Sequence, residues 1–167
     1  TKRLKSHIIS SRQLKLSKAI YFSVFDSIDG FWQVKLDKES SYLTTFWSPC
    51  GRLRWLRMPF GINIAPEEYQ RRQTEHVADL EGVAVIADDH LVYGYGDTIE
   101  EANKDHDNNL RGLLERAREI GLRFNSTKMR LRLNQVRYMG HFITSEGLKP
   151  DPEKVNAIKK MPRPSDM

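Results

Sequence analysis

The sequence predicts an α+β fold in which helices cover one face of an antiparallel sheet. Short apolar runs occur in pairs joined by tight turns, a pattern typical of β-hairpins. Amphipathic segments with helical spacing separate these pairs, so the predicted order is strand, hairpin, helix, hairpin, helix, small hairpin and helix. The 167 residues, 39% of them hydrophobic, are enough for one domain with a substantial core.

The composition limits the classes of function. The chain has 27 Lys and Arg against 22 Asp and Glu, and its net charge of +5 weakly favours nucleic acid or another anionic partner. Cys50 is the single cysteine, which excludes an internal disulfide framework and a cysteine-rich zinc site. No apolar run approaches the roughly 20 residues of a membrane span, and no signal peptide opens the chain. We therefore expect a soluble protein that has no membrane partner and is not secreted.

The first predicted strand ends in a carboxylate. Residues 1–18 are strongly basic and form a solvated lead-in or a short surface helix, with a segment facing nucleic acid as the alternative. Tyr21–Phe25 then alternates like a strand and stops at Asp26, which precedes the predicted turn Ser27–Gly30. Asp26 is therefore either a functional carboxylate or a cap for that turn.

A second hairpin combines cations with aromatic side chains. Tyr42–Phe46 and Leu53–Leu56 are predicted as strands joined around Pro49–Gly51. Such interleaving suits phosphate contacts and base stacking, although exposed arginines on strands are common without any ligand. The residues that carry the pattern are Trp47, Arg52, Arg54, Trp55 and Arg57.

Three helices are expected after this hairpin. Pro66 suits the first turn of a helix that runs to about Leu80, with Gln73 on its otherwise apolar face. Thr98-Ile99-Glu100-Glu101 forms a capping box at the start of a long amphipathic helix. That helix ends at Gly121 and carries His106 as a packed rather than a ligating histidine. Asp151-Pro152-Glu153 begins a last helix that reaches about Met161.

Between the last two helices the sequence predicts short elements only. Leu122–Phe124 is a short strand, and Asn125–Arg130 is a basic loop that contains Lys128. Val136–Met139 and Phe142–Thr144 form a small hairpin around Gly140-His141.

The centre of the chain is the hairpin Gly82–Gly96, which carries Asp88 and Asp89 at its tip between two apolar runs. Aspartates suit tight turns, which is the simple explanation. Two adjacent carboxylates beside an apolar sheet are nevertheless costly without a compensating cation, so the pair also indicates a divalent-metal site. In an α+β layer the end of the first strand can lie beside this tip, which would bring Asp26 next to the pair.

Several motifs together resemble the reverse transcriptase of gypsy-type LTR retrotransposons, whose Pol polyprotein includes a palm of this kind. The similarity covers nearly the whole chain from about Leu16 onward, with the motifs in the family's order and at its spacing. The motifs are YFSVFD at Tyr21–Asp26, WSPCGRLRWLRMPFGINIAPEEYQ at Trp47–Gln70, IADD at Ile86–Asp89, and YMGH at Tyr138–His141 followed by EGLKPDPEKVNAI.

The resemblance implies a catalytic role for four residues. Asp26, Asp88 and Asp89 match the palm carboxylates that hold two Mg²⁺ or Mn²⁺ ions during RNA-directed DNA synthesis. Two metals lower the pKa of the primer 3′-hydroxyl and neutralise charge on the leaving pyrophosphate. Lys128 falls where the family places a basic residue near that pyrophosphate, to which it could donate a proton, or it is a solvated loop lysine.

The resemblance also implies binding sites and partners. The partners are an RNA or DNA template with its primer and deoxynucleoside triphosphates. The residues expected to bind the nucleotide are Phe31, Phe60 and Gly61. The residues expected to bind primer or template are Tyr138, Met139, Gly140 and His141, together with Arg57 from the arginine pattern.

The implied architecture is a palm with partial fingers and no thumb. Residues 1–18 would be a basic lead-in or partial fingers, 19–148 the palm with partial fingers, and 149–167 a helix leading toward a thumb. The implied location is inside the cell, in a cytoplasmic particle or the nucleus.

Two residues of the central hairpin depart from the family pattern. Ile86 stands where Tyr is common, and His90 stands where an aliphatic residue is usual, so that His90 either perturbs the carboxylates or faces solvent. The resemblance would also place the outer fingers before Thr1 and the thumb after Met167. The alternative function is therefore a truncated, catalytically silent palm that at most binds nucleic acid. A two-metal nuclease or phosphatase is a weaker alternative, because nothing in the sequence supplies the additional His or Glu ligands expected for it.

Overall fold

A four-stranded antiparallel sheet with the strand order β4–β5–β1–β6 forms the centre of the protein. The computed structural model describes residues 19–138, 141–144 and 146–161, so the basic lead-in and Met139-Gly140 lie outside the described residues. The strands of the central sheet are β1 (Ala19–Asp26), β4 (Val83–Ile86), β5 (Asp89–Tyr95) and β6 (Arg130–Leu133). The predicted first strand and central hairpin are thus confirmed, whereas β6 begins inside the segment that was predicted as a loop.

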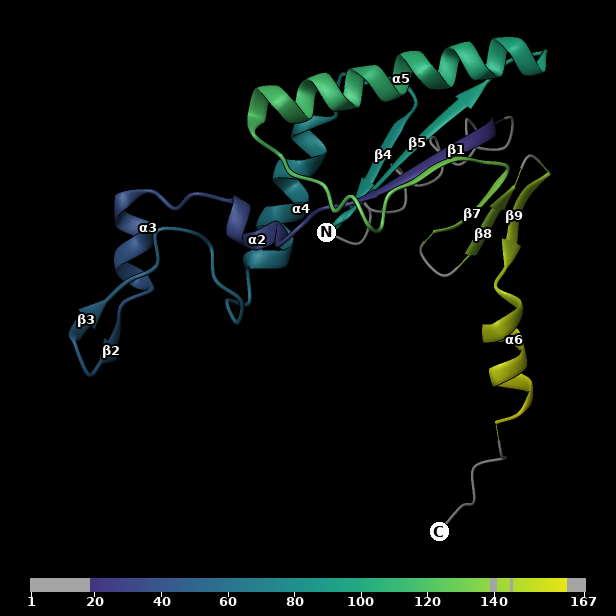
Figure 1. Ribbon diagram of the computed structural model, residues 1–167. Coiled ribbons are helices and arrows are strands. Elements are labelled where there is room, and N and C mark those ends of the chain that lie inside the picture. The colour runs from purple at the N-terminus through teal and green to yellow at the C-terminus, as the bar shows by residue number, and fades with distance from the viewer. Residues whose placement is uncertain (1–18, 139–140, 145, 162–167) are drawn as a thin grey trace.

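Two helices cover one face of this sheet, as the sequence predicts (Figure 1). The helix α5 (Ile99–Ile120) lies along β5 and β1, and α4 (Ala65–His76) lies against β4. Because side chains alternate along a strand, every second residue points toward the helices. Phe25 and Val92 of the sheet pack there with Leu113 of α5 and Val77, which follows α4. The helix α4 ends four residues before Leu80, so its predicted end was too late.

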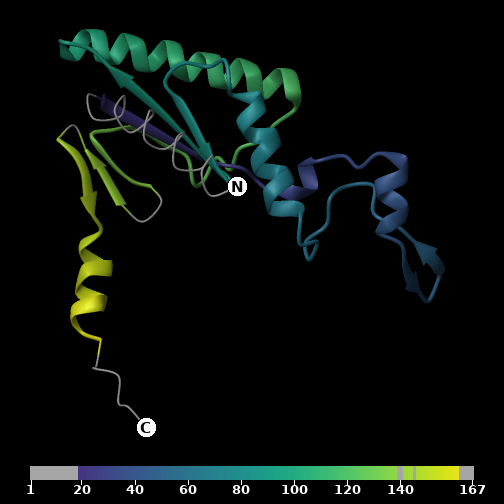
Figure 2. The ribbon, with the colours of Figure 1, turned by 180° about the vertical axis from the view of Figure 1, so that it is seen from behind.

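A second, three-stranded sheet covers the opposite face (Figure 2). Its strands are β7 (Gln135–Tyr138), β8 (His141–Thr144) and β9 (Gly147–Pro150). Val136 and Ile143 of this sheet pack on Phe22 and Leu91 of the central sheet. The predicted small hairpin is confirmed, and β9 is an addition. The helix α6 (Pro152–Lys159) follows with Asp151 as its N-cap, as predicted, and ends two residues before Met161.

The second predicted hairpin is partly wrong. Tyr42 and Leu43 end a helix, α3 (Lys38–Leu43), because the Asp37 side chain accepts a hydrogen bond from the Ser40 amide at 2.7 Å and so caps it. The hairpin itself is shorter than predicted, with strands β2 (Phe46–Ser48) and β3 (Gly51–Leu53). Residues 38–55, which include α3, β2 and β3, form a side lobe that extends away from the central sheet (Figures 1 and 2).

The side lobe joins the rest of the protein through aromatic side chains. The short helix α2 (Gly30–Gln33) follows β1 and carries Trp32, whose ring centroid lies 4.8 Å from that of Trp55 in the lobe. Arg52 and Arg54 of the lobe lie over the rings of Trp47 and Tyr42, at 4.8 and 4.2 Å from the ring centroids. The predicted interleaving of cations and aromatic residues is therefore present. Two of the arginines form cation–π contacts within the lobe itself.

The capping box of α5 is present as predicted. The Thr98 side chain accepts a hydrogen bond from the Glu101 amide at 3.2 Å, and a Glu101 carboxylate oxygen accepts one from the Thr98 amide at 3.2 Å. The helix ends at Gly121, which has a φ of 72°. Leu122–Phe124 was predicted as a strand, but it contributes only an isolated bridge between Phe124 and Ser27.

We expect Thr98→Ala to lower the free energy of unfolding by about 1 kcal/mol, because the backbone N–H of Glu101 at the start of α5 loses its acceptor. Thr98→Ser keeps the hydroxyl acceptor and should cost much less. Urea titration of the three proteins measures the difference. Equal losses in the two variants would mean that the threonine methyl group, and not the cap, matters.

Candidate active site

The pairing of β1 with β5 brings Asp26 and Asp89 together. The two strands are antiparallel, and the Cα of Asp26 lies opposite the Cα of Asp89 in the last pair of the ladder. Residues opposite each other in such a ladder project from the same face of the sheet. This is the face on which Phe22 and Leu91 pack, away from α4 and α5. The predicted convergence of Asp26 with the acidic hairpin is confirmed for Asp89.

Asp88 occupies the turn between β4 and β5 and lies toward α2. Its backbone carbonyl accepts a hydrogen bond from the Ser27 amide at 2.8 Å, which ties the turn to the end of β1. Its carboxylate lies against Gly30, because a Cβ built on Gly30 would be 2.2 Å from Asp88 Oδ1 and 2.9 Å from the Tyr69 ring. A glycine at position 30 therefore leaves the room that the Asp88 carboxylate occupies.

The three carboxylates act on one another electrostatically. Burial raises the pKa of both Asp88 and Asp89 above the usual range, and repulsion from Asp26 raises both further. Asp88 and Asp89 remain exposed to solvent, so water screens part of this repulsion. The Lys128 ammonium opposes it, since it lowers the pKa of both. The pKa of both residues nevertheless stays raised, so Lys128 does not fully offset their burial and their repulsion from Asp26.

Lys128 reaches the site from the loop before β6. Its Nζ lies 3.1 Å from both carboxylate oxygens of Asp26, although the two residues are 102 positions apart. The lysine side chain is 61% exposed and the aspartate side chain 24%. An ion pair this exposed is weak, so a stronger cation can displace the lysine.

A cavity of about 370 Å³ opens beside Asp26 and Asp89. Asp88 is not among the residues that line it. The lining residues are Val24, Asp26, Asp89, Thr127, Lys128, Arg130, Val136 and Arg137. Carboxylate oxygens are the donors that Mg²⁺ and Mn²⁺ prefer, so the residues fit a divalent ion in kind. In the described part of the chain, however, no three His, Cys, Asp or Glu side chains already converge on one point, and the Asp26 oxygens are turned to Lys128.

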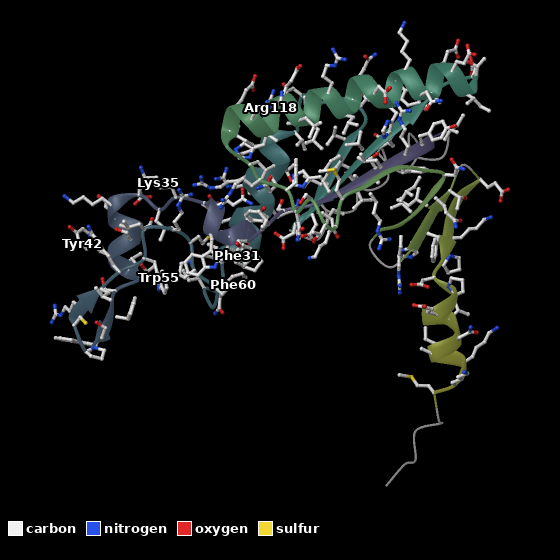
Figure 3. The ribbon with its side chains drawn as sticks, in the orientation of Figure 1. Phe31, Lys35, Tyr42, Trp55, Phe60 and Arg118 are labelled. Carbon is white, nitrogen blue, oxygen red and sulfur yellow. The ribbon has the colours of Figure 1, made fainter. Side chains whose placement is uncertain are left out.

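The residues predicted to bind the nucleotide lie next to Asp88. Phe31 follows Gly30 directly, and its ring centroid lies 5.1 Å from that of Phe60 and 5.5 Å from that of Tyr69. Figure 3 shows Phe31 and Phe60 side by side at the base of the side lobe, with Trp55 farther out. Phe60 is 64% exposed, and Gly61 has a φ of 92°, a conformation that favours glycine. The structure therefore groups these three residues at one end of the acidic site.

The residues predicted to bind primer or template are only partly brought to the site. The hairpin β7–β8 borders the cavity through Val136, and His141 begins β8 as an exposed residue. Tyr138 ends β7, and Met139 and Gly140 lie outside the described residues. Arg57 instead donates a hydrogen bond to the Gln33 carbonyl at 2.9 Å, at the end of α2.

Two basic residues of the cavity, Arg130 and Arg137, were not predicted as site residues. Arg137 is ion-paired with Asp151, the buried N-cap of α6, and lies 3.1 Å from Glu153. Its position one residue before the YMGH motif is the signal that could have identified it. Arg130 had no such signal. It was placed at the end of a predicted loop, whereas it begins β6, the strand that pairs with β1.

His90 is buried beneath the acidic turn, so the interpretation that it faces solvent was wrong. Its Nε2 lies 3.3 Å from Oε1 of Gln73, which is also buried, and its ring packs against Phe124. His90 Nε2 and Gln73 Oε1 thus satisfy each other, although each residue alone would be a polar group in an apolar layer. His106 is packed as predicted, with its Nε2 2.8 Å from Ser23 Oγ.

We expect the protein to lose stability in acid through these histidines. Burial lowers the pKa of His90 from 6.5 to about 4, and burial lowers the pKa of His106 and His76 in the same direction. Between pH 6.5 and about 4, His90 is protonated in the unfolded chain but stays neutral in the folded chain. The free energy of unfolding therefore decreases as the pH is lowered through this range. His90 alone accounts for a loss on the order of 3 kcal/mol, and chemical denaturation across this range measures it.

The paired variant Gln73→Leu/His90→Val supplies the control for that loss. It removes both polar groups, so its stability should depend less steeply on pH than that of the wild type. Gln73→Leu alone leaves His90 without its partner and should be less stable at neutral pH than the paired variant. An unchanged acid limb in the paired variant would exclude His90 as its source.

Residues 2–143 match the family model described as "Reverse transcriptase (RNA-dependent DNA polymerase)". The chain is 32% identical over 154 residues to the "Retrovirus-related Pol polyprotein from transposon 412" of Drosophila melanogaster, covering 91% of this chain and 12% of the relative. It is 28% identical over 151 residues to the corresponding polyprotein from transposon gypsy of the same organism, covering 89% and 14%.

Solved structures agree on the fold. The foamy viral protease–reverse transcriptase in complex with double-stranded DNA, in a form designated dRH, superposes with a TM-score of 0.73 at 23% identity, covering 91% of this chain and 26% of that one. The same viral protein in complex with an RNA/DNA hybrid gives a TM-score of 0.69 at 24% identity, covering 88% and 19%.

No helix among the described residues has the length and apolar character that a membrane crossing requires. The chain spans about an eighth of the length of the Drosophila polyproteins. The family model, in contrast, accounts for most of the chain and includes Asp26, Asp88, Asp89 and Lys128. The chain belongs to the reverse transcriptase (RNA-dependent DNA polymerase) family.

Proposed function

We propose that this chain is the catalytic palm of an RNA-directed DNA polymerase that adds deoxynucleotides to a primer 3′-hydroxyl with two divalent metal ions. The observation that supports it most is the register of β1 and β5, in which Asp26 lies opposite Asp89 with Asp88 next to them in the turn. Two strands far apart in the sequence place oxygen donors at one end of a sheet, beside a cavity. Structural stability gives no reason for three carboxylates there, because their mutual repulsion is unfavourable.

Asp26 and Asp89 would hold the metal ions, together with Asp88. When bound, two such ions lower the pKa of the primer hydroxyl and neutralise charge on the leaving pyrophosphate. For this to happen, Asp26 must exchange its contact with Lys128 for one with an ion. Because solvent reaches this ion pair, it is weak, and little free energy is lost when Asp26 leaves Lys128.

Lys128 then becomes available for a second task. Once released from Asp26, its Nζ remains at the cavity, where an ammonium group can donate a proton to an oxygen of the departing pyrophosphate. Arg130 and Arg137 line the same cavity and can contact phosphate groups. The proposed division of labour is that the aspartates hold cations and the basic residues hold phosphates.

The nucleotide would lie between the aspartates and the aromatic group. Phe31 and Phe60 contact each other beside Asp88, and Phe60 is largely exposed. A flat exposed ring can pack under a sugar or a base, and the open backbone at Gly61 allows close approach. We propose that Phe31, Phe60 and Gly61 bind the incoming deoxynucleoside triphosphate. The β7–β8 hairpin, from Tyr138 to His141, would bind the primer.

Template and primer are proposed partners on the strength of the fold and the relatives. The superposed viral enzyme is described in complex with an RNA/DNA hybrid and with double-stranded DNA. In this chain, the net charge of +5 and the basic cavity wall favour a nucleic acid partner.

Primer extension tests the proposal. The full-length protein, supplied with an RNA template, a DNA primer, deoxynucleoside triphosphates and Mg²⁺, should extend the primer, and Asp26→Asn should not. Extension that is the same in Asp26→Asn would overturn the proposal. Folding of the variant is confirmed by circular dichroism, so that loss of activity is not loss of structure.

A second candidate is a palm that folds and binds nucleic acid without catalysis. The contact of Lys128 with both oxygens of Asp26 favours it, because this ion pair competes with a metal ion for the same donors. Such a protein would bind primer–template with a steep salt dependence and add no nucleotide. Any extension by residues 1–167 alone would exclude this candidate.

A further inference from the structure

The turn that carries the carboxylates contains a strained residue. Ile86 and Asp89 pair across the hairpin, so Ala87 and Asp88 form a two-residue turn. Ala87 has a φ of 52°, in the left-handed region that an alanine adopts only at a cost. Two-residue hairpin turns of this kind commonly use glycine at the first position. Something outside the turn must therefore stabilise Ala87.

The side chain of Gln70 on α4 contacts this turn directly. Its Oε1 accepts a hydrogen bond from the Ala87 amide at 2.7 Å. Its Nε2 donates to the carbonyl of Val85 at 3.2 Å and to the hydroxyl of Thr74, one turn along the helix, at 3.0 Å. A single amide thus binds the backbone on both sides of Ile86, and Thr74 fixes its orientation.

Three residues further along α4, Gln73 contacts the hairpin as well. It is bonded to His90, which directly follows Asp89. Residues three apart on a helix lie on the same face, so α4 presents both glutamines to the acidic turn. One holds the residue before Asp88, and the other holds the residue after Asp89.

We propose that Gln70 is a positioning residue, which holds Ala87 in its left-handed conformation and thereby sets the direction of the Asp88 and Asp89 carboxylates. Without it, the turn would relax, and Asp88 would leave the space beside Gly30 that its carboxylate now occupies. The consequence for metal binding rests on the proposed two-metal function, whereas the conformational role does not. Gln70 touches no reacting group, so it acts only through the turn.

Gln70→Met is the direct test, because methionine keeps the length of the side chain and removes both of its hydrogen bonds to the turn. In the isotope-labelled 167-residue chain, NMR should find that the Ala87 amide exchanges with solvent much faster in the variant. The Asp88 and Asp89 amide signals should also shift. Titration with Mn²⁺, which broadens nearby signals, should require an about tenfold higher concentration to affect Asp26, Asp88 and Asp89, the size expected when the support of a metal ligand is lost.

Rescue by Ala87→Gly separates positioning from ordinary packing. Glycine adopts a positive φ without cost, so the turn then needs less support. In Gln70→Met/Ala87→Gly, the Asp88 and Asp89 signals and the Mn²⁺ response should return most of the way to wild type. A loss of α4 packing would not be repaired by a change in the turn.

The matched control is Arg71→Met, the same substitution one residue along on the exposed side of α4. Arg71 pairs with Glu68 and Glu75 on its own helix, so the turn should be unaffected. Should Gln70→Met fail to fold, Gln70→Glu keeps an acceptor for the Ala87 amide and loses the donor to Val85. It should retain the slow Ala87 exchange but shift the Asp88 signal.

Ala87 exchange that is unchanged in Gln70→Met would overturn the proposal, as would Mn²⁺ broadening that occurs in the wild type and is equal in Gln70→Met. Fast exchange of the Ala87 amide in Gln70→Glu would also overturn the proposal. If Mn²⁺ broadens none of these signals even in the wild type, the two-metal function fails instead. The role of Gln70 is then decided by the exchange and shift measurements alone.

Discussion

Replacing Asp89 by Asn is expected to abolish primer extension by the full-length protein, with a loss on the order of 10³-fold or more, and to leave the fold intact. The amide keeps the size of the side chain and removes its charge, so only the capacity to hold a cation is lost. Asp89 lies opposite Asp26 in the ladder and lines the cavity. Its replacement should therefore disrupt the proposed metal site between β1 and β5.

The same substitution should raise the melting temperature slightly. Burial and repulsion from Asp26 raise the pKa of Asp89, so its charge is unfavourable in the folded protein at neutral pH. Removing the charge removes that cost, although the side chain is exposed and the gain is correspondingly small. Thermal unfolding and primer extension are measured on the same preparation. Lower activity together with higher stability identifies a functional residue rather than a structural one.

Asp97→Asn provides the matched control, since it makes the same charge change beyond the other end of β5. It should retain extension. If Asp97→Asn and Asp89→Asn lose activity equally, the effect comes from net charge and nucleic acid affinity, and the assignment of Asp89 is wrong.

Gly94→Ala is expected to lower the free energy of unfolding by about 3 kcal/mol. At Gly94 the helix α5 lies directly against β5, because an added Cβ would lie 2.4 Å from His106 Cβ and 2.5 Å from the Ala102 carbonyl oxygen. Backbone atoms cannot move aside as a side chain can, so the helix itself must shift. For a protein of this size the melting temperature should fall by about 6–12 °C, which circular dichroism measures.

Gly112→Ala should instead raise the free energy of unfolding. Gly112 lies inside α5, and its added Cβ would meet only Leu80 Cδ2, at an ordinary 3.7 Å. Alanine is favoured over glycine within a helix by about 1 kcal/mol, so the variant should be more stable than the wild type. If both substitutions destabilise equally, α5 does not pack on β5 as closely as described.

The central part of the site could be predicted because it depends on local chemistry and on sheet topology. The sequence shows an apolar run that stops at Asp26 and a hairpin with two aspartates at its tip. When the two elements pair as antiparallel strands, the end of the first strand lies beside the tip of the hairpin, so the aspartates meet. The capping box at Thr98 is equally local, since all of its atoms lie within four residues.

The features that could not be predicted depend on tertiary contacts. Tyr42–Phe46 was predicted as a strand, but Tyr42 and Leu43 belong to a helix that Asp37 caps. Gln73 interrupts an otherwise apolar helix face and His90 stands where an aliphatic residue is usual, but nothing in the sequence indicates that these two residues, 17 positions apart, pair with each other. Gln70 gave no signal at all, since a half-buried glutamine and an exposed one look alike on a helix. The pairing of Lys128 with Asp26 likewise spans 102 residues.

Anomalous diffraction from crystals of the full-length protein, grown with primer–template and a deoxynucleoside triphosphate in the presence of Mn²⁺, tests the central assignment most directly. We expect Mn²⁺ within direct coordination distance, about 2.0–2.3 Å, of carboxylate oxygens from both Asp26 and Asp89, with Lys128 Nζ no longer on Asp26. Ions bound elsewhere, or an Asp26 carboxylate still held by Lys128 while the nucleotide occupies the cavity, would contradict it.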